Sequence, residues 1–195
     1  LLIIVLQTLV APSGFATVWS VTNNNDSGSG SLRAAITNLN GGSGTAGDTI
    51  QFSNGIGTIT LGSSLPVITK RVTITAPSSQ VISGNSANRI FATYGAGVAN
   101  SASLTLTNLT LQNGKATGST GTANGAGGGG GGGFGGGVYV DLGQTLTLNN
   151  TTIQSCTAQG GVGGTGSAGK KAGGAGGTAS FGTGTEGVTG YGGGN

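Results

Sequence analysis

The segment that decides the fold runs from residue 104 to residue 118 and reads LTLTNLTLQNGKATG. It aligns without gaps on residues 146–160, LTLNNTTIQSCTAQG, and eight of the fifteen positions are identical. Repetition at a fixed spacing, here 42 residues, is typical of stacked repeats rather than of sandwiches. The two segments are therefore predicted to lie against each other as equivalent strands of successive turns.

Apolar and polar residues alternate at the start of the first copy. In residues 104–107 the leucines are expected to point inward and the threonines outward, because successive side chains of a strand face opposite sides. Leu146 or Leu148 of the second copy then stacks on the inward leucines, and each buried leucine contributes roughly 1.5–3 kcal/mol. Asn108 and Asn150 fall where the chain turns. Stacked asparagines can share amide hydrogen bonds there, and asparagine tolerates left-handed backbone.

Short apolar runs of the same kind begin at Asp48 and alternate with Gly, Ser, Asn and Pro. The predicted strands are 49–52, 58–61, 67–68, 72–74, 81–82, 89–91 and 104–106. Together with the repeat they predict an all-β solenoid whose coils occupy residues 48–160. The spacing of 42 residues fits two coils of roughly 20–22 residues, or one coil with a glycine-rich insertion at 118–137. We favour the second, and expect the insertion to loop out as flexible chain.

Residues 17–47 are predicted to form an N-terminal cap. The segment 17–22 alternates and reads as a strand, with Val18 and Trp19 expected to anchor the start of the core. After a turn-rich stretch, residues 31–39 read as the only convincing helix, because apolar residues recur at helical spacing. Ser29 or Ser31 is available as its N-cap, and the glycines at 41–42 end it.

The two ends of the chain differ from the middle. Residues 1–16 combine an apolar run with small residues before a cut after Ala16, so we interpret them as a truncated secretory signal peptide. A buried core strand is the alternative, and a membrane span would need about 20 apolar residues. Residues 161–195 are predicted to be a glycine-rich, low-complexity segment that is also truncated. Secretion, without a membrane span in the mature segment, is the expectation.

The composition excludes several classes of function. The chain has 45 glycines, 6% charged residues and a net charge of +3, with its seven basic residues scattered. Nucleic-acid binding requires clustered basic residues with aromatic interleaving, so no nucleic-acid partner is expected. A single cysteine, Cys156, and no histidine exclude an internal disulfide and a Cys/His metal site. Cys156 aligns with Gly114 of the first copy, which predicts a packing role for the thiol.

Two parts of the sequence resemble a known family. The segment 25–36, NDSGSGSLRAAI, followed by GDTIQF at 47–52, resembles the N-terminal opening of bacterial right-handed parallel β-helix surface proteins. The segment 135–140, GGGVYV, is similar to the Gly-Gly-Ala-Ile motif of chlamydial polymorphic outer membrane proteins and related autotransporter-passenger-like adhesins. The resemblance implies a right-handed β-helix, exposed outside the cell and used in adhesion or as a stalk. It implies that the helix at 31–39 shields the open end of the solenoid.

Parallel β-helices also include polysaccharide lyases and glycosidases, and glycoside hydrolysis generally requires two carboxylates about 5–10 Å apart. The chain offers only Asp26, Asp48, Asp141 and Glu186, and no two of them share a predicted strand or helix face. The first two are expected in turn and capping roles, and Asp141 in a turn with Gly143. The chain is thus predicted not to be an enzyme, and no catalytic, cofactor-binding or metal-binding residue is assigned.

Two further patterns carry little chemistry. Residues 164–171, GTGSAGKK, approach a phosphate-binding loop but lack the hydroxyl residue that holds Mg²⁺. The outward threonines Thr105, Thr107 and Thr147 are suited to a flat ladder like those of ice-binding β-helices, yet threonine is also an ordinary solvent-facing strand residue. The leading hypothesis is therefore a secreted structural or adhesive protein of the bacterial surface. Its partners would be glycans or other molecules of host or neighbouring cells. The alternative is the N-terminal part of a carbohydrate-active β-helix enzyme whose active residues lie downstream.

Overall fold

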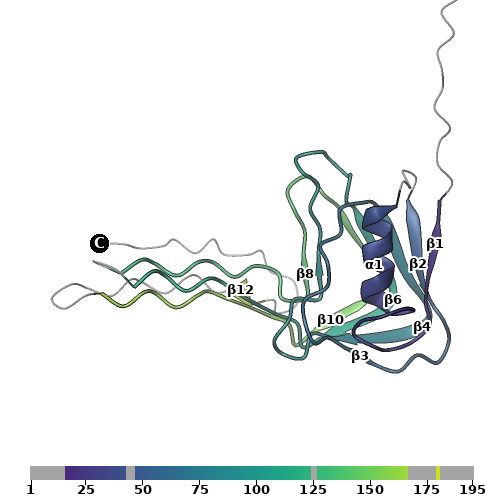
Figure 1. The fold of residues 1–195 in the computed structure, drawn as a ribbon, viewed down its shortest axis with the longest axis horizontal. Helices are drawn as coiled ribbons and strands as arrows, with labels where there is room; N and C mark the ends of the chain where they lie inside the picture. The colour runs from purple at the N-terminus through teal and green to yellow at the C-terminus, as the bar shows by residue number, and fades with distance from the viewer. Residues whose placement is uncertain (1–15, 43–46, 124–126, 167–178, 181–195) are drawn as a thin grey trace, which may run out of the picture.

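The computed structural model describes residues 16–42, 47–123, 127–166 and 179–180. Strands and a single described helix form one body, from which extended glycine-rich segments project (Figure 1). The elements in chain order are β1 (Val18–Val21), α1 (Leu32–Gly41), β2 (Asp48–Phe52), β3 (Ile59–Thr60), β4 (Val72–Ser83), β5 (Phe91–Ala92), β6 (Leu104–Gln112), β7 (Lys115–Thr117), β8 (Val138–Tyr139), β9 (Leu146–Asn149), β10 (Thr152–Gln154), β11 (Thr157–Gln159) and β12 (Ala179–Ser180). The predicted all-β class is confirmed.

The main sheet is parallel throughout. Its strands follow the order β1-β2-β4-β6-β10, with β3 paired to β4 and β9 paired to β6. A second parallel pair joins β5 to β8, and a third sheet joins β7 to β11 in parallel, with β12 antiparallel on β11. Parallel neighbours require a crossover connection, so the chain travels away from the main sheet and back between successive strands.

The register of the last two layers follows the sequence repeat. Leu104 pairs with Leu146, Thr110 with Thr152, and β7 with β11, each at an offset of 42 residues. The predicted stacking of the two copies is therefore confirmed. An antiparallel hairpin between them is excluded by the same pairing.

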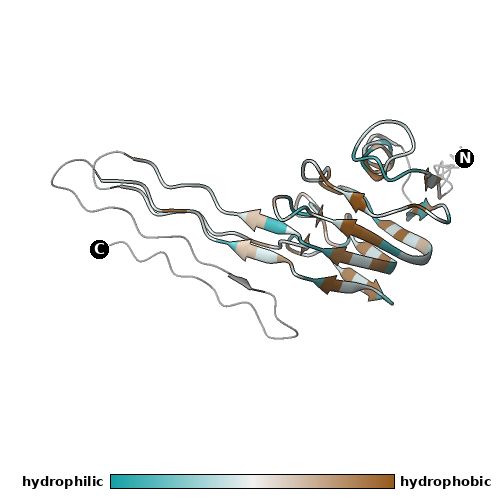
Figure 2. Ribbon diagram, turned by 90° about the horizontal axis from the view of Figure 1, so that it is seen from below, coloured by the Kyte–Doolittle hydropathy of each residue, from teal (hydrophilic) through white to brown (hydrophobic). Residues whose placement is uncertain are grey.

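Alternation along the strands builds the core. Ile50, Ile74 and Leu106 occupy one register position on β2, β4 and β6, and all three are fully buried. Figure 2 shows the resulting bands of apolar and polar residues along these strands. The next residue of this column, Leu148 on β9, is 43% exposed, because no described strand pairs with the outer edge of β9.

Asparagines shape the bend within each layer. Asn108 and Asn150 have φ angles of 58° and 46°, the left-handed region that asparagine tolerates better than most residues. The Nδ2 of Asn150 donates to Oδ1 of Asn108 at 2.9 Å, and the Nδ2 of Asn108 donates to the carbonyl of Ala76 at 2.8 Å. The predicted turn position and shared amide hydrogen bond are both confirmed.

Helix α1 covers the N-terminal end of the core. Ser31 is its N-cap, with Oγ accepting from the N–H of Ala34 at 3.2 Å, and Gly42 ends it. The buried face is Leu32, Ala35, Ile36 and Leu39, as the helical spacing predicts. Trp19 packs against this core, but the prediction for Val18 is wrong. Its side chain is 57% exposed, because Val18 pairs with Thr49 on the outward face of the sheet.

The glycine-rich segments depart from expectation. The chain leaves the body after β7, which pairs with β11, and returns as β8, which pairs with β5, so residues 118–137 connect two different sheets. Segments 118–122, 128–133 and 159–164, here called the glycine arm, are joined to one another by backbone hydrogen bonds. The expectation of flexible chain is thus wrong for the described part of the insertion, because glycine backbones approach closely enough to pair.

Candidate functional site

Each described acidic residue holds backbone in place. The buried Asp48 accepts from the N–H of Thr17 at 2.9 Å and from Nε1 of Trp19 at 3.4 Å, which fastens β1 to β2. Asp141 accepts from the N–H of Gly95 at 3.1 Å. Its own carbonyl accepts from the N–H of Gln144 at 3.1 Å in the predicted turn. Glu186 lies outside the described residues.

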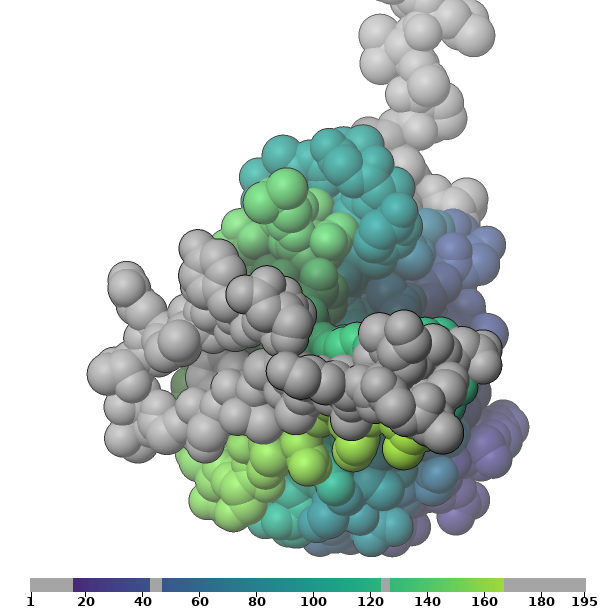
Figure 3. All heavy atoms as spheres, turned by 90° about the vertical axis from the view of Figure 1, so that its left-hand side faces the viewer, coloured from purple at the N-terminus to yellow at the C-terminus, as the bar shows by residue number. Residues whose placement is uncertain are grey.

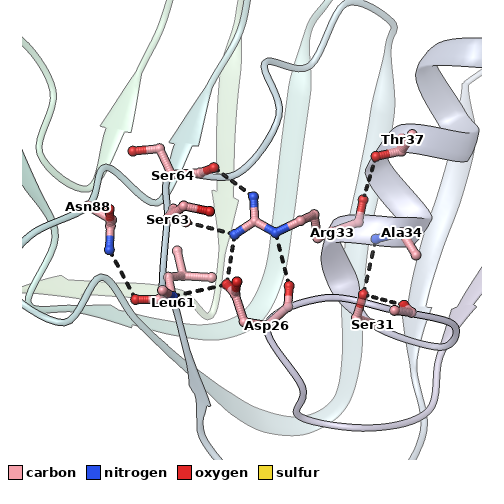
Figure 4. Close-up of polar contacts among 11 residues, drawn as sticks. Asp26, Ser31, Arg33, Ala34, Thr37, Leu61, Ser63, Ser64 and Asn88 are labelled. Carbon is pink, nitrogen blue, oxygen red and sulfur yellow. Dashed lines mark hydrogen bonds and ion pairs between the residues drawn. The ribbon is translucent and has the colours of Figure 1, made fainter.

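The third acid, Asp26, belongs to a cluster of polar contacts around Arg33 (Figure 4). Nη2 of Arg33 donates to Oδ1 of Asp26 at 2.7 Å, and Nε of Arg33 donates to the Asp26 carbonyl at 3.0 Å. The same guanidinium donates to the carbonyls of Ser63 and Ser64, each at 2.7 Å. Oδ1 of Asp26 also accepts from the N–H of Gly62 at 3.1 Å. We call these five residues the capping clamp.

The capping clamp joins segments that are distant in sequence. Arg33 stands on the first turn of α1, Asp26 lies in the loop before that helix, and the serines lie after β3. The planar guanidinium makes several directed hydrogen bonds at once, which a lysine ammonium cannot reproduce. All four hydrogen bonds from the Arg33 guanidinium go to protein acceptors. The cluster therefore holds the helix against the loop that follows β3. Sequence reasoning treated Arg33 as one of several scattered basic residues and missed this role.

A second polar cluster joins the loop between β5 and β6 to the loop between β8 and β9. Oε1 of Gln144 accepts from the N–H of Ala102 at 2.7 Å, and Nε2 of Gln144 donates to the carbonyl of Val98 at 2.8 Å. The N–H of Asn100 donates to the carbonyl of Gly143 at 2.9 Å. Figure 3 shows the two loops, teal and green, side by side at the upper end of the molecule. These contacts order the loops and assemble no reactive group.

The thiol of Cys156 contacts Gly114, the residue at the equivalent position of the first copy of the repeat. The N–H of Gly114 donates to Sγ at 3.3 Å, and the thiol donates to the carbonyl of Gln154 at 3.3 Å. Burial raises the pKa of the Cys156 thiol above its ordinary value, while the hydrogen bond from Gly114 acts in the opposite direction. The thiol is therefore protonated at neutral pH and is a weak nucleophile. These contacts agree with a packing role.

The outward face of the main sheet carries the most regular array of side chains. Its first row runs through Thr49, Thr73, Thr105 and Thr147, which are register partners on β2, β4, β6 and β9. Its second row runs through Gln51, Thr75, Thr107 and Asn149. We call these eight residues the outer ladder. All of them are uncharged hydroxyl or amide residues, and they repeat about every 4.8 Å across the strands.

Metal and phosphate sites find no support in the described part of the chain. No group of three or more His, Cys, Asp or Glu residues is close enough there to hold a metal ion. The phosphate-loop-like pattern at 164–171 continues past Gly166 into residues outside the description. The first fifteen residues, which carry most of the proposed signal peptide, are outside it as well.

Comparison of the chain with protein-family models, with curated proteins and with solved structures finds no match. Within the described residues, the structure has no helix with the length and apolar character that crossing a membrane requires. The geometry of this chain is accordingly the basis for a functional proposal.

Proposed function

We propose that the stacked strands are successive turns of a right-handed parallel β-helix whose N-terminal end is closed by α1. The proposal is supported by the parallel pairing of β2, β4 and β6, and by a second parallel pair, β5 with β8, on the return path of the chain. The isolated parallel bridge between Ile68 and Thr93 extends this second set by one layer. Crossovers between parallel strands are right-handed in nearly all proteins.

The protein then acts as a non-catalytic adhesive or structural protein of the bacterial outer surface. The outer ladder is the observation that carries this role. Hydroxyl and amide side chains both donate and accept hydrogen bonds, as sugar hydroxyls do, so a row of them fits a neutral glycan through many weak contacts. The outer ladder has no charged residue, which argues against nucleic acids or acidic polymers as partners, since these are bound through basic side chains.

An extracellular location is supported by sequence rather than by geometry. Residues 1–16 have the apolar run and small residues of a secretory signal, and the segment 25–36 resembles the opening of exported β-helix surface proteins. A host or neighbouring cell is therefore the source of the glycan in this proposal.

Binding to a printed array of neutral and acidic oligosaccharides tests the role. The fluorescently labelled protein is expected to bind neutral oligosaccharides. The double substitution Thr105→Lys and Thr107→Lys should abolish the signal, because it places charge in the centre of the outer ladder. Thr120→Lys, on an exposed residue of the glycine insertion, is the matched control and should bind as the unmodified protein does. Absence of binding, or equal binding by the ladder variant, would reject the proposal.

A second assay addresses the enzymatic alternative. Incubation with neutral and uronate-containing polysaccharides should yield neither new reducing ends nor unsaturated uronate absorbance. Each described carboxylate accepts backbone or side-chain hydrogen bonds at 2.7–3.4 Å from the fold itself, which supports this expectation. Turnover of any of these polymers would favour the enzyme over the adhesin.

A further inference from the structure

The glycine arm has a hydrogen-bonding pattern that neither a β-sheet nor an α-helix produces. Its three segments lie side by side as they extend from the body (Figures 1 and 2). The bonds form a closed cycle in which each segment donates to one neighbour and accepts from the other. They are Gly118 N–H to Gln159 O (2.8 Å), Gly121 to Val162 (2.8 Å), Gly161 to Gly131 (2.7 Å), Gly164 to Gly128 (2.8 Å), Gly128 to Thr122 (2.9 Å) and Gly131 to Ser119 (2.8 Å).

The donors recur at every third residue in each segment. A strand donates to a given neighbour at every second residue, and an α-helix bonds within itself. An extended helix with three residues per turn and no internal hydrogen bonds has the observed period. Exposure follows the same period, since Gly161 and Gly164 are buried while Gln159, Val162 and Thr165 are exposed.

Glycine is required at several positions where the segments meet. A Cβ atom added to Gly161 would overlap the carbonyl oxygen of Ser119, and one added to Gly118 would overlap that of Gly131. A Cβ on Gly133 would likewise overlap the carbonyl oxygen of Gln159. Backbone cannot move aside as a flexible side chain does, so these positions resemble the axial glycines of the collagen triple helix.

The backbone conformation and the attachment of the arm agree with an ordered helix. None of the six donor glycines has a positive φ angle. A polyproline II helix also has negative φ, and residues with side chains adopt it readily. At the base, Arg89 donates from Nε to the carbonyl of Gly135 at 3.0 Å and from Nη2 to that of Phe134 at 2.8 Å. The guanidinium carbon also lies 5.4 Å from the ring centroid of Tyr139.

From these observations we infer that the glycine arm is a rigid bundle of three threefold extended helices, built without a side-chain core. It projects from the stacked strands, separate from the outer ladder, and its three segments carry no charged residue. Gln159, Val162 and Thr165 are exposed and, at three residues apart, follow one another at intervals of about 9 Å along the arm. The inference is independent of the proposed glycan binding.

Amide hydrogen exchange, measured by NMR on the complete ¹⁵N-labelled chain, tests the inference directly. The six donor amides should exchange on the order of tenfold or more slowly than the amides between them, because only the donors are hydrogen-bonded. Uniformly fast exchange along the arm would show a disordered chain. Protection at alternate residues would show a β-sheet, and either result would overturn the inference.

A pair of glycine substitutions separates bundle packing from a general effect of alanine. Gly161→Ala should remove the protection of Gly118, Gly121 and Gly131, while the amides of β6 remain protected because the core is intact. Gly132→Ala is the control, since its Cβ would meet only the ring of the exposed Phe134. Retained protection in Gly161→Ala, or equal loss in both variants, would contradict the close packing.

Discussion

At the scale of single residues, the side chain that organises the N-terminal end is Arg33. Its side chain is 19% exposed and that of Asp26 is 31% exposed, so the ion pair is partly shielded from water. Exposed ion pairs contribute little to the stability of a fold. The Arg33 guanidinium, however, also donates hydrogen bonds to three carbonyl oxygens, so it combines charge with directed hydrogen bonds. The capping clamp is therefore expected to matter more for stability than a surface salt bridge.

Replacing Arg33 tests this expectation. Arg33→Ala should lower the free energy of unfolding by about 1.5–3 kcal/mol, the range for hydrogen bonds to charged groups. Arg33→Lys should recover only part of it, because one ammonium cannot reach all of the acceptors. Urea unfolding followed by circular dichroism measures both.

The matched control is Arg71→Ala, at an exposed arginine, which should change stability by no more than about 0.5 kcal/mol. Full stability of Arg33→Lys would mean that charge alone, without directed hydrogen bonds, holds the clamp.

At the scale of elements, the two copies of the repeat are similar in sequence but differ in burial. Leu106 on β6 is fully buried between Ile74 and Leu148, whereas Leu148 on β9 has a partner on one side only. The same holds one bend later, where Leu111 is fully buried and Ile153 on β10 is 37% exposed. The position of a strand in the stack therefore decides how far its apolar side chains are buried, and hence how much they stabilise the fold.

Truncating the two leucines measures this difference. Leu106→Ala should cost about 2–5 kcal/mol, since it leaves a cavity in a filled layer. Leu148→Ala should cost at most about 1.5 kcal/mol, because part of its side chain is already in water. Chemical denaturation of both variants under identical conditions gives the comparison. Equal losses would argue that another layer covers Leu148 in solution.

At the scale of the whole molecule, the stack of strands needs a closed end. An uncovered end would expose core side chains and unpaired strand edges, which favour aggregation. In the proposed β-helix, α1 closes the N-terminal end. Four of its apolar side chains are buried, and the capping clamp fastens the helix to the loop after β3. The helix is therefore expected to control solubility as well as stability.

Charging the buried face of the helix tests this role. Ile36→Asp places a carboxylate at a position with no exposure and should cost more than about 3 kcal/mol, with a rise in aggregated protein. Light scattering and urea unfolding measure the two effects. Thr37→Asp, on the adjacent exposed residue, should remain soluble and within about 0.5 kcal/mol of the unmodified protein. Similar behaviour of the two variants would contradict a capping function.

Several features of the fold were predictable because they are encoded within a few residues of one another. The alternation in 104–107 predicts a strand with one buried face, and the 42-residue repeat predicts the register of β6 with β9. Ser31 and the helical spacing predict α1, and Asn108 predicts a left-handed bend. For the acids, sequence correctly placed Asp141 in a turn.

Other features were decided by contacts between distant segments. The guanidinium of Arg33 finds Ser63 and Ser64 thirty or more residues away, and nothing in the local sequence marks those carbonyls as its partners. The exposure of Val18 depends on which face of β2 it meets, since a period of two does not say which side is the core.

The sequence by itself determined the strands, the helix and the stacking of the repeat, because side-chain periodicity and turn residues act locally and each alternating run has one apolar face. Only the tertiary structure decided the order within the glycine arm. Glycine carries no side chain to leave a hydrophobic pattern, so its packing depends on backbone groups that are identical along the chain. Their pairing is selected by where β7, β8 and β11 deliver the three segments.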